Sequence, residues 1–358
     1  MQTAALLSGG LLMKPKAAAA VETKGVWFMP DEAEPHQRTW MAFGPSQKIW
    51  GAKLLPEAQR NLATIARTIA KYEPVSMLVR ESDYRLAEKL VGPKVELIVA
   101  PLDDLWMRDT GPVFVLNEQG QKAAIDFNFN GWGEKQAHAQ DAEVAAFIAE
   151  HARVEVMQTE LILEGGGIEV DGHGTAIIAE SCVLNANRNP DFTKAQAETE
   201  LKKLLGLEKI IWLPGIKGKD ITDGHTDFYA RFARPGVVVA GYDSDPNSYD
   251  HAVTKKYLEL LKSAKDAHGK PFEVITLTAP KTVRKTWETE EFASGYIGFY
   301  ACNGAVIAQE FGDAQADLAV KKALQKAFPE REVVQINIDG IAAGGGSIHC
   351  ATQQEPKL

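Results

Sequence analysis

The chain repeats one supersecondary pattern, and this repeat limits the folds that it can form. The order strand, strand, helix, strand recurs about five times, with a period of roughly 60 to 70 residues. The clearest copy has predicted strands at 168–170 and 175–179, a helix at 194–205 and a strand at 209–213. Glycine permits a tight hairpin turn at Asp171-Gly172-His173-Gly174, between the first two of these strands. The repeat favours an α/β fold of radial or stacked units over one doubly wound sheet.

The other copies are predicted at matching intervals. Their elements lie at 26–29, 39–43, 57–72 and 75–79; at 113–116, 123–129, 137–151 and 154–157; at 226–232, 237–240, 249–265 and 272–277; and at 295–300, 305–309, 314–328 and 333–338. Charged motifs occupy similar places in successive copies, which predicts a closed ring with the active site on its axis. The glycine-rich turn near the C-terminus is expected to close this ring beside the N-terminal strands.

Residues 25–358 are expected to form a single domain, because no linker rich in Pro, Ser or Gly divides them. Residues 1–24 are treated as a leader and excluded from the fold. Their apolar run, Ala4 to Met13, has the length of a signal-peptide core. Gln2 to Leu7 resembles the middle of a twin-arginine signal that lacks its Arg-Arg start. A truncated signal would direct the protein to the periplasm or outside the cell; without one, the cytoplasm is expected.

The net charge and the cysteine content limit the kinds of ligand and partner that the sequence predicts. The formal net charge is −9 and no basic run is present, so neither charge nor sequence predicts a nucleic-acid partner. No segment beyond the leader approaches the roughly 18 apolar residues of a membrane span. Cys182, Cys302 and Cys350 are too widely spaced for a disulfide framework or a CxxC metal motif. The excess of acidic residues suits a small cationic substrate. The sequence leaves open whether the protein forms a homo-oligomer.

Cys350 follows a run of three glycines in the segment 344–356. Glycine allows backbone conformations closed to other residues, and so lets a following side chain reach a pocket rim. Free cysteines are usually buried and inert, so a reactive Cys350 requires partners elsewhere in the chain. Cys182 and Cys302 are interpreted as structural.

Three further clusters place ionisable residues beside glycines. They are 103–112, which contains Trp106, Arg108 and Asp109; 164–169, which begins with Glu164; and 222–227, which contains His225 and Asp227. Taken singly, each has an ordinary structural explanation, such as a local ion pair or a buried histidine. If 226–232 is a strand, His225 and Asp227 project to the same side of it.

One thiol, one imidazole and three carboxylates suit a guanidinium substrate. The carboxylates raise the pKa of a nearby thiol and so suppress the thiolate, unless the substrate itself is positive. A guanidinium presents forked N–H donors that match carboxylates, and its central carbon is an electrophile. Substrate binding would therefore promote the thiolate when it is needed.

Five motifs resemble those of the agmatine deiminase family. They are WMRDTGP (106–112), EGGGIEVDGHGT (164–175), NANRNP (185–190), TDGHTD (222–227) and GGGSIHCATQQEP (344–356). The segment 29–44 is similar to the family's opening, so the resemblance covers nearly all of 27–356. It implies the five-bladed α/β-propeller (pentein) fold of guanidine-modifying enzymes, with pseudo-fivefold ββαβ repeats, and one deiminase domain over 25–358.

The resemblance also implies a role for each site residue. Cys350 would be the nucleophile, His225 the general acid and base, and Glu164 the group that holds or polarises His225. Asp109 and Asp227 would clamp the guanidinium, and Trp106 would lie near the substrate. No metal or organic cofactor is implied. The implied reaction converts agmatine to N-carbamoylputrescine and ammonia through a covalent S-alkylthiouronium, as in putrescine biosynthesis from arginine.

Departures from the family keep alternatives open. Ser347 stands where Asn is more common, and Thr226 where Val is more common. A peptidylarginine or free-arginine deiminase of the same fold is one alternative, but no arginine pair lies near 126–133 to bind a substrate carboxylate. Outside enzymes, an exported polyamine-binding protein is an alternative. A zinc hydrolase using His225, Asp227, His349 and Cys350 is another, although these residues lack the usual HxxxH or CxxC spacing.

Overall fold

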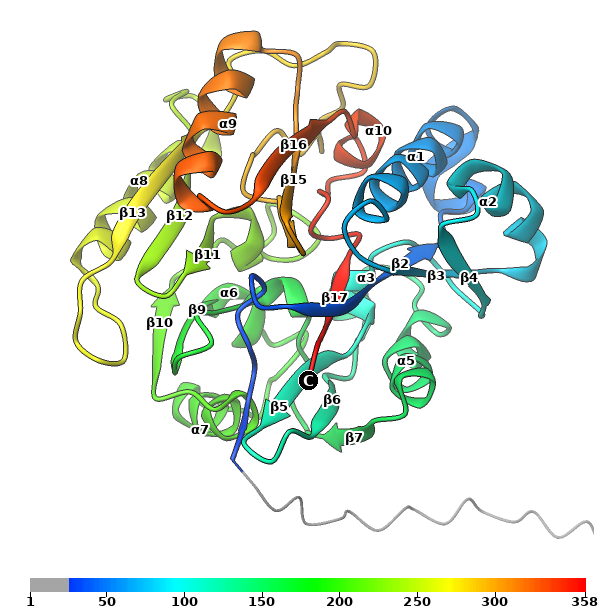
Figure 1. Ribbon diagram of the computed structural model, residues 1–358. Helices are drawn as coiled ribbons and strands as arrows, with labels where there is room; N and C mark the ends of the chain where they lie inside the picture. Colours follow the sequence, from blue (N-terminus) through cyan, green and yellow to red (C-terminus); the bar gives the residue numbers. More distant parts are fainter. Residues whose placement is uncertain (1–25) are drawn as a thin grey trace, which may run out of the picture.

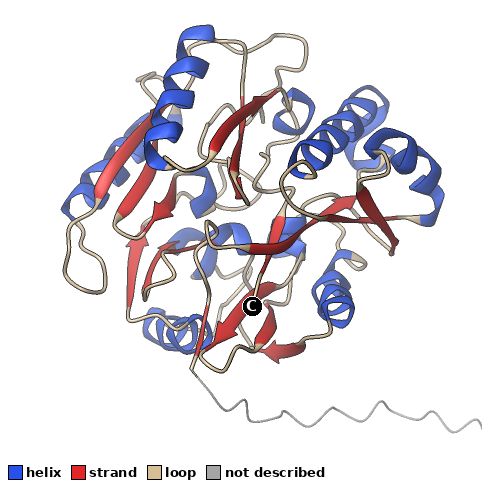
Figure 2. Ribbon diagram, in the orientation of Figure 1, coloured by secondary structure: helices blue, strands red, loops and turns tan. Residues whose placement is uncertain are grey.

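The structure, a computed structural model, describes residues 26–358, and its strands form five separate sheets (Figure 1). The leader predicted over residues 1–24 lies outside the described residues. The longer helices lie toward the outside of the molecule, whereas most strands and some short helices lie nearer its middle (Figure 2). Within residues 26–358, no helix is long and apolar enough to cross a membrane.

Each sheet has three or four strands and is accompanied by one or two helices. The first has β17 (Gln353–Pro356), β2 (His36–Phe43), β3 (Val75–Val79) and β4 (Val95–Val99), with α1 (Gln47–Ile69) and α2 (Tyr84–Val91). The second has β1 (Trp27–Phe28), β5 (Val113–Asn117), β6 (Lys122–Asp126) and β7 (Glu155–Gln158), with α5 (Val144–Ala152). The third has β8 (Ile168–Val170), β9 (Thr175–Ala179) and β10 (Lys209–Leu213), with α7 (Lys194–Leu205).

The last two sheets are built in the same way. The fourth has β11 (Ala230–Arg234), β12 (Val237–Tyr242) and β13 (Glu273–Thr278), with α8 (Tyr249–Ser263). The fifth has β14 (Tyr300–Cys302), β15 (Ala305–Gln309) and β16 (Glu332–Ile336), with α9 (Ala314–Ala327). Short helical turns complete the chain: η1 (Glu81–Asp83), α3 (Met107–Thr110), α4 (Gly131–Glu134), η2 (Asp141–Glu143), η3 (Gly165–Gly167), α6 (Glu180–Val183), η4 (Thr226–Phe228) and α10 (Asp339–Ala342).

In every sheet an antiparallel pair and a parallel pair share a middle strand, and the first and second sheets each add one further pair, β3–β4 and β1–β5. In the third sheet, β8 pairs antiparallel with β9, and β10 pairs parallel with β9 after the chain passes through α7. The fourth and fifth sheets repeat this order around β12 and β15. A parallel pair needs a crossover connection, which the helix supplies. The α/β class is confirmed, and the predicted ββαβ order is observed in the second to fifth sheets.

Local sequence explains why α7 begins and ends where it was predicted. Thr193 accepts a hydrogen bond from the N–H of Gln196, whose side chain bonds back to the backbone of Thr193, forming a capping box. Gly206 ends the helix with φ +66°, a conformation that favours glycine. Leu201 and Leu205 are buried on the side of α7 that packs into the core.

Segments near the two ends of the described chain meet in the first sheet. β17 pairs antiparallel with β2, with Gln353 opposite Trp40, so the segment after the glycine-rich turn lies beside an N-terminal strand as expected (Figure 1). One assignment is wrong. The predicted strand 26–29 does not open the first sheet, because β1 pairs with β5 in the second sheet. Trp27 and Met29 pack into the apolar cluster that the second and third sheets share.

Three other predicted bounds are corrected. Residues 226–228 form η4 rather than a strand, because Thr226 Oγ1 donates to the carbonyl of Gly167 (3.2 Å) and accepts from the N–H of Ala179 (3.1 Å). These bonds hold the segment as a turn, and β11 begins at Ala230. The predicted strand at 295–300 is observed as β14 from Tyr300. The predicted helix at 137–151 is regular only from Val144, after η2.

Candidate active site

Turns that precede or follow strands of different sheets bring the predicted site residues together. Asp109 lies on α3, Glu164 precedes η3, His225 and Asp227 lie at η4, and Cys350 ends the glycine-rich turn. All five are buried: Asp109 is 7% exposed and Cys350 6%, while the other three are 1% exposed or less. Because His225 and Asp227 lie on a turn, the expectation that they share one side of a strand is wrong.

The His225 imidazole lies between two carboxylates. Its Nε2 is 3.2 Å from Glu164 Oε2 and its Nδ1 is 3.7 Å from Asp109 Oδ1. Arg188 Nε donates to Glu164 Oε1 at 2.8 Å, which fixes this carboxylate against the ring. Burial works to lower the pKa of His225, but Asp109 and Glu164 outweigh it and raise the pKa to about 9. The imidazole is therefore a cation at neutral pH.

Gly166 allows Asp109 and His225 to approach this closely. Its N–H donates to Asp109 Oδ1 at 3.1 Å, and a Cβ at Gly166 would lie 2.6 Å from His225 Nδ1 and 2.9 Å from Asp109 Oδ1. Any side chain here would displace one of these groups. Trp132 Nε1 donates to the other oxygen of Asp109 at 2.9 Å. Burial raises the pKa of Asp109 to about 6, although the His225 charge opposes the rise.

Asp227 has one oxygen held and one free of any hydrogen bond. His349 Nδ1 lies 2.7 Å from Asp227 Oδ2, whereas Asp227 Oδ1 is buried without a partner among the described residues. Burial favours the neutral acid, but His349 and His225 outweigh it and lower the pKa of Asp227. A buried, unpaired carboxylate oxygen is costly, so this atom is well suited to accept from a bound N–H group.

The Cys350 thiol has a hydroxyl and a carboxylate nearby. Its Sγ is 3.2 Å from Ser347 Oγ and 3.8 Å from Asp227 Oδ2. Burial, followed by the charges of Asp227 and Asp109, raises the pKa of the thiol well above its usual range. The free site therefore holds a protonated cysteine, as expected from its excess of carboxylates.

A buried ionic network behind the site was not predicted as functional. Glu32 Oε2 lies 2.9 Å from His349 Nε2, and Arg108 and Arg231 donate to Glu32 at 3.0 Å and 2.8 Å. His349 thus joins Asp227 to Glu32 through its two ring nitrogens. Glu32 lies within the N-terminal motif at 29–44, but that stretch gives no sign that its carboxylate reaches the segment before Cys350.

Trp106 borders the glycine-rich turn. A Cβ at Gly346 would overlap the Trp106 ring, so glycine is needed where the indole rests on the turn. Trp106 Nε1 donates to Asp104 Oδ2 at 3.1 Å, and Trp50 Nε1 donates to Asp104 Oδ1 at 2.7 Å. One carboxylate therefore orients two indoles, whose ring centroids are 5.8 Å apart.

The zinc alternative gains no support from this geometry. Both ring nitrogens of His349 contact carboxylates, and those of His225 face Asp109 and Glu164. In the part of the chain that the structure describes, no group of three or more His, Cys, Asp or Glu residues is arranged to hold a metal ion.

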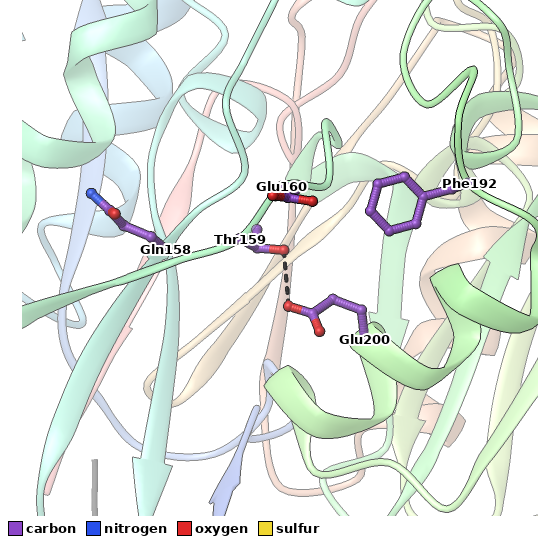
Figure 3. Close-up of a pocket in the computed structure, with 5 residues that line it drawn as sticks. All are labelled: Gln158, Thr159, Glu160, Phe192 and Glu200. Atoms are coloured by element: carbon purple, nitrogen blue, oxygen red, sulfur yellow. Dashed lines mark hydrogen bonds between the residues drawn. The ribbon is translucent and has the colours of Figure 1, made fainter. Parts of the chain in front are cut away.

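A separate surface pocket lies away from these residues. Figure 3 shows its lining, in which Thr159 Oγ1 donates to Glu200 at 3.1 Å. The residues that line it are Gln158, Thr159, Glu160, Phe192 and Glu200. It contains none of the predicted site residues.

Comparisons with known proteins identify the family of this chain. The family of Porphyromonas-type peptidyl-arginine deiminases matches residues 28–356. A relative from Streptomyces coelicolor is 42% identical over 336 residues, which cover 92% of this chain and 98% of the relative. A Pseudomonas putida protein named agmatine deiminase is 36% identical, with 92% and 95% of the two chains covered.

A solved structure has the same architecture. The agmatine deiminase of Enterococcus faecalis superposes with a TM-score of 0.89 at 30% identity, covering 95% of this chain and all of that one. The family match spans nearly all described residues and includes every predicted site residue. This chain therefore belongs to the family of Porphyromonas-type peptidyl-arginine deiminases.

Proposed function

We propose that the protein hydrolyses agmatine to N-carbamoylputrescine and ammonia. The observation that carries this proposal is a cluster of buried ionisable groups. The Cys350 thiol lies 3.8 Å from Asp227 Oδ2, and the His225 imidazole lies between Asp109 and Glu164. Relatives from Pseudomonas putida and Enterococcus faecalis carry the name agmatine deiminase. Such a site suits a substrate group that carries a positive charge and is also an electrophile. A guanidinium has both properties.

Asp109 and Asp227 are proposed as the guanidinium clamp. Glu164 is already paired with Arg188, so its charge is largely satisfied within the protein. Asp227 Oδ1, in contrast, has no partner among the described residues. Asp109 lies close by, since a Cβ on Gly166 would lie 2.9 Å from Asp109 Oδ1 and 3.1 Å from Asp227 Oδ2. Forked N–H donors of the substrate would complete both carboxylates and fix the central carbon for attack. Trp106 is proposed to lie beside the substrate's aliphatic chain.

The first half-reaction begins with ionisation of Cys350. The bound guanidinium offsets the charges of Asp227 and Asp109, so the thiol loses its proton to solvent and becomes a thiolate. Sγ attacks the guanidinium carbon, forming a carbon–sulfur bond. His225, as imidazolium, protonates one amino group, and the carbon–nitrogen bond breaks to release ammonia. A cationic S-alkylthiouronium remains on Cys350, and His225 is left neutral.

The second half-reaction returns the site to its starting state. Neutral His225 accepts a proton from a water molecule as the water oxygen attacks the same carbon. The carbon–sulfur bond then breaks, the remaining hydroxyl proton passes to the departing sulfur, and the neutral ureido product forms. Cys350 is thereby restored as a thiol and His225 as a cation. Glu164 holds the His225 ring in one orientation throughout, because its contact with Nε2 is fixed by Arg188. Every step uses residues of this chain.

The five sheets are proposed as the blades of a pseudo-fivefold propeller, with residues 25–358 as one deiminase domain. The turns that carry Asp109, Glu164 and His225 come from successive repeats, and Cys350 directly precedes β17. A radial arrangement explains why residues so distant in sequence meet in one place.

The pH dependence of kcat/KM tests the proposed protonation states of Cys350 and His225. At neutral pH the free site holds a thiol and a His225 cation, which is one proton more than the reactive thiolate–imidazolium pair. Between about pH 6 and about pH 9, where His225 titrates, we expect kcat/KM for agmatine to rise about tenfold per pH unit. Below about pH 6, where Asp109 is also protonated, the rise with pH should be steeper.

The corresponding limb of kcat should lie at lower pH, because bound substrate lowers the pKa of the thiol. Rates should be measured with saturating and with limiting agmatine over the same buffers. A flat kcat/KM between about pH 6 and about pH 9 would contradict this account, since it would make the fully protonated site itself reactive.

Substrate choice is the main test of the proposal. The buried arginines near the site are already paired, Arg108 and Arg231 with Glu32 and Arg188 with Glu164. An arginine carboxylate would therefore be desolvated beside carboxylates without a cation. We expect kcat/KM for agmatine to exceed that for free arginine or an arginyl peptide by about 10³-fold or more.

Ammonia release from the three substrates should be measured in parallel, with and without a chelator. Comparable kcat/KM for an arginyl peptide would assign the chain to the peptidylarginine alternative. Tight agmatine binding without ammonia release would favour the polyamine-binding alternative, and loss of activity on chelation would revive the metal alternative.

A further inference from the structure

Ser347 is the hydroxyl residue that contacts the nucleophile. Its Oγ lies 3.2 Å from Cys350 Sγ, and the two side chains are 4% and 6% exposed. The turn itself places them together, because Ser347 and Cys350 are three residues apart. The hydroxyl is held from outside as well: a Cβ on Gly298 would overlap the Ser347 side chain, and the carbonyl of Gly298 accepts the N–H of His349 at 3.0 Å.

A second hydrogen bond sets the direction of the first. The N–H of Cys350 donates to Ser347 Oγ at 3.4 Å, so the hydroxyl oxygen already acts as an acceptor. The remaining hydroxyl hydrogen is then free to point at Sγ. The thiol hydrogen has its own acceptor, since Sγ donates to Asp227 Oδ2 at 3.8 Å. When the thiol ionises, the serine donor is already in place.

The other ionisable groups near Sγ give it no comparable support. Asp227 on η4 and Asp109 on α3 are anions that oppose a thiolate, and both contribute to the raised thiol pKa. His225 is a cation, but its ring nitrogens face Asp109 and Glu164. His349 likewise faces Asp227 and Glu32. A neutral donor adds stabilisation of the thiolate without adding a charge that would repel a cationic substrate.

We propose that Ser347 is a catalytic residue whose hydroxyl donates a hydrogen bond to the Cys350 thiolate. The role rests on the proposed function, in which that thiolate attacks the guanidinium carbon. Hydrogen bonds to ionised groups are stronger than those between neutral groups, so the bond favours the charged sulfur over the thiol. Ser347 thereby offsets part of the opposition from Asp227 and Asp109.

The test measures the thiol without requiring turnover. Iodoacetamide alkylates a thiolate, forming a carbon–sulfur bond and releasing iodide, so its rate against pH reports the ionisation of Cys350. Peptide mass spectrometry separates Cys350 from Cys182 and Cys302. We expect Ser347→Ala to slow alkylation of Cys350 near neutral pH by about tenfold, because a hydrogen bond to a charged group is lost. With agmatine, the acid limb of kcat should move up by about one pH unit.

Two variants separate the hydroxyl from packing. Thr352 lies in the same turn and its hydroxyl donates to the carbonyls of Ile348 and His349, not to Sγ, so Thr352→Val should keep the wild-type alkylation profile. Ser347→Thr keeps the donor and should also keep the profile. An unchanged profile in folded Ser347→Ala, or equal slowing in the Ala and Thr variants, would overturn the proposal. Absence of agmatine turnover in the wild type would reject the proposed function while leaving the alkylation result readable.

Discussion

Cys350→Ser should lower kcat for agmatine by about 10⁴-fold or more, equivalent to about 5 kcal/mol of transition-state stabilisation. Cys350 is 6% exposed, and serine is close to cysteine in size, so the structure should be retained. A serine hydroxyl is far less ionised and less nucleophilic than a thiol, and His225 makes no contact that would activate it, because its ring nitrogens face Asp109 and Glu164. Ammonia release measures the loss, and calorimetry with agmatine measures the binding that remains.

The matched controls for this variant are the other cysteines. Cys182 and Cys302 are fully buried in apolar clusters, and Cys182→Ser and Cys302→Ser should keep kcat within a few-fold of wild type once the folded fraction is taken into account. Near wild-type activity in Cys350→Ser would reject thiol catalysis. Equal loss in all three variants would instead indicate a folding defect.

His225→Ala should also lower kcat by about 10⁴-fold or more, because the same imidazole must donate a proton in one half-reaction and accept one in the other. Each proton transfer alone is worth about 10² to 10⁴-fold. The substitution also removes the cation between Asp109 and Glu164, which leaves two buried carboxylates facing a gap. Thermal unfolding should be measured beside activity, so that lost stability is not counted as lost catalysis.

Rapid quenching distinguishes the two steps for this variant. We expect no burst of ammonia and no adduct on Cys350, since the first half-reaction already needs the proton of His225. A burst of one equivalent with a stable adduct would mean that His225 acts only in hydrolysis. His173 lies exposed in the β8–β9 turn, and His173→Ala is the control that should leave both half-reactions unchanged.

Local signals in the sequence were sufficient for much of the fold. The bounds of β8, β9, α7, β10 and β15 agree with the predicted ranges. In these elements the hydrophobic pattern, the turn glycines and the helix caps all act over short distances. The bounds were wrong where tertiary contacts decide. Thr226 has a β-branched side chain suited to a strand, but its two hydrogen bonds to other segments hold it in η4.

In the site, too, residues marked by local sequence signals were predicted, whereas those that depend on tertiary contacts were not. Cys350, His225, Asp109, Asp227 and Glu164 are marked by flanking glycines and by the family resemblance, and the structure brings them together. Glu32 lies in the segment 29–44 that is similar to the family's opening, but no glycine flanks it and no neighbouring residue marks it as part of the site. Its importance depends on His349, Arg108 and Arg231 reaching it from other segments, and contacts of this kind become visible only when the sheets are assembled.

The pairing of β17 with β2 has a consequence for how the protein gains and loses activity. Cys350 is three residues before Gln353, whose partner in β2 is Trp40, so the segment that holds Cys350 is anchored by a contact between segments near opposite ends of the described chain. Such contacts carry the largest loop-closure entropy and tend to form late during folding. Helices and four of the sheets can assemble from nearer neighbours, whereas the Cys350 thiol reaches its place only when β17 pairs with β2. Enzymatic activity is thus a reporter of completed folding. Local opening of the β17–β2 pair would inactivate the protein while most of its secondary structure remains intact.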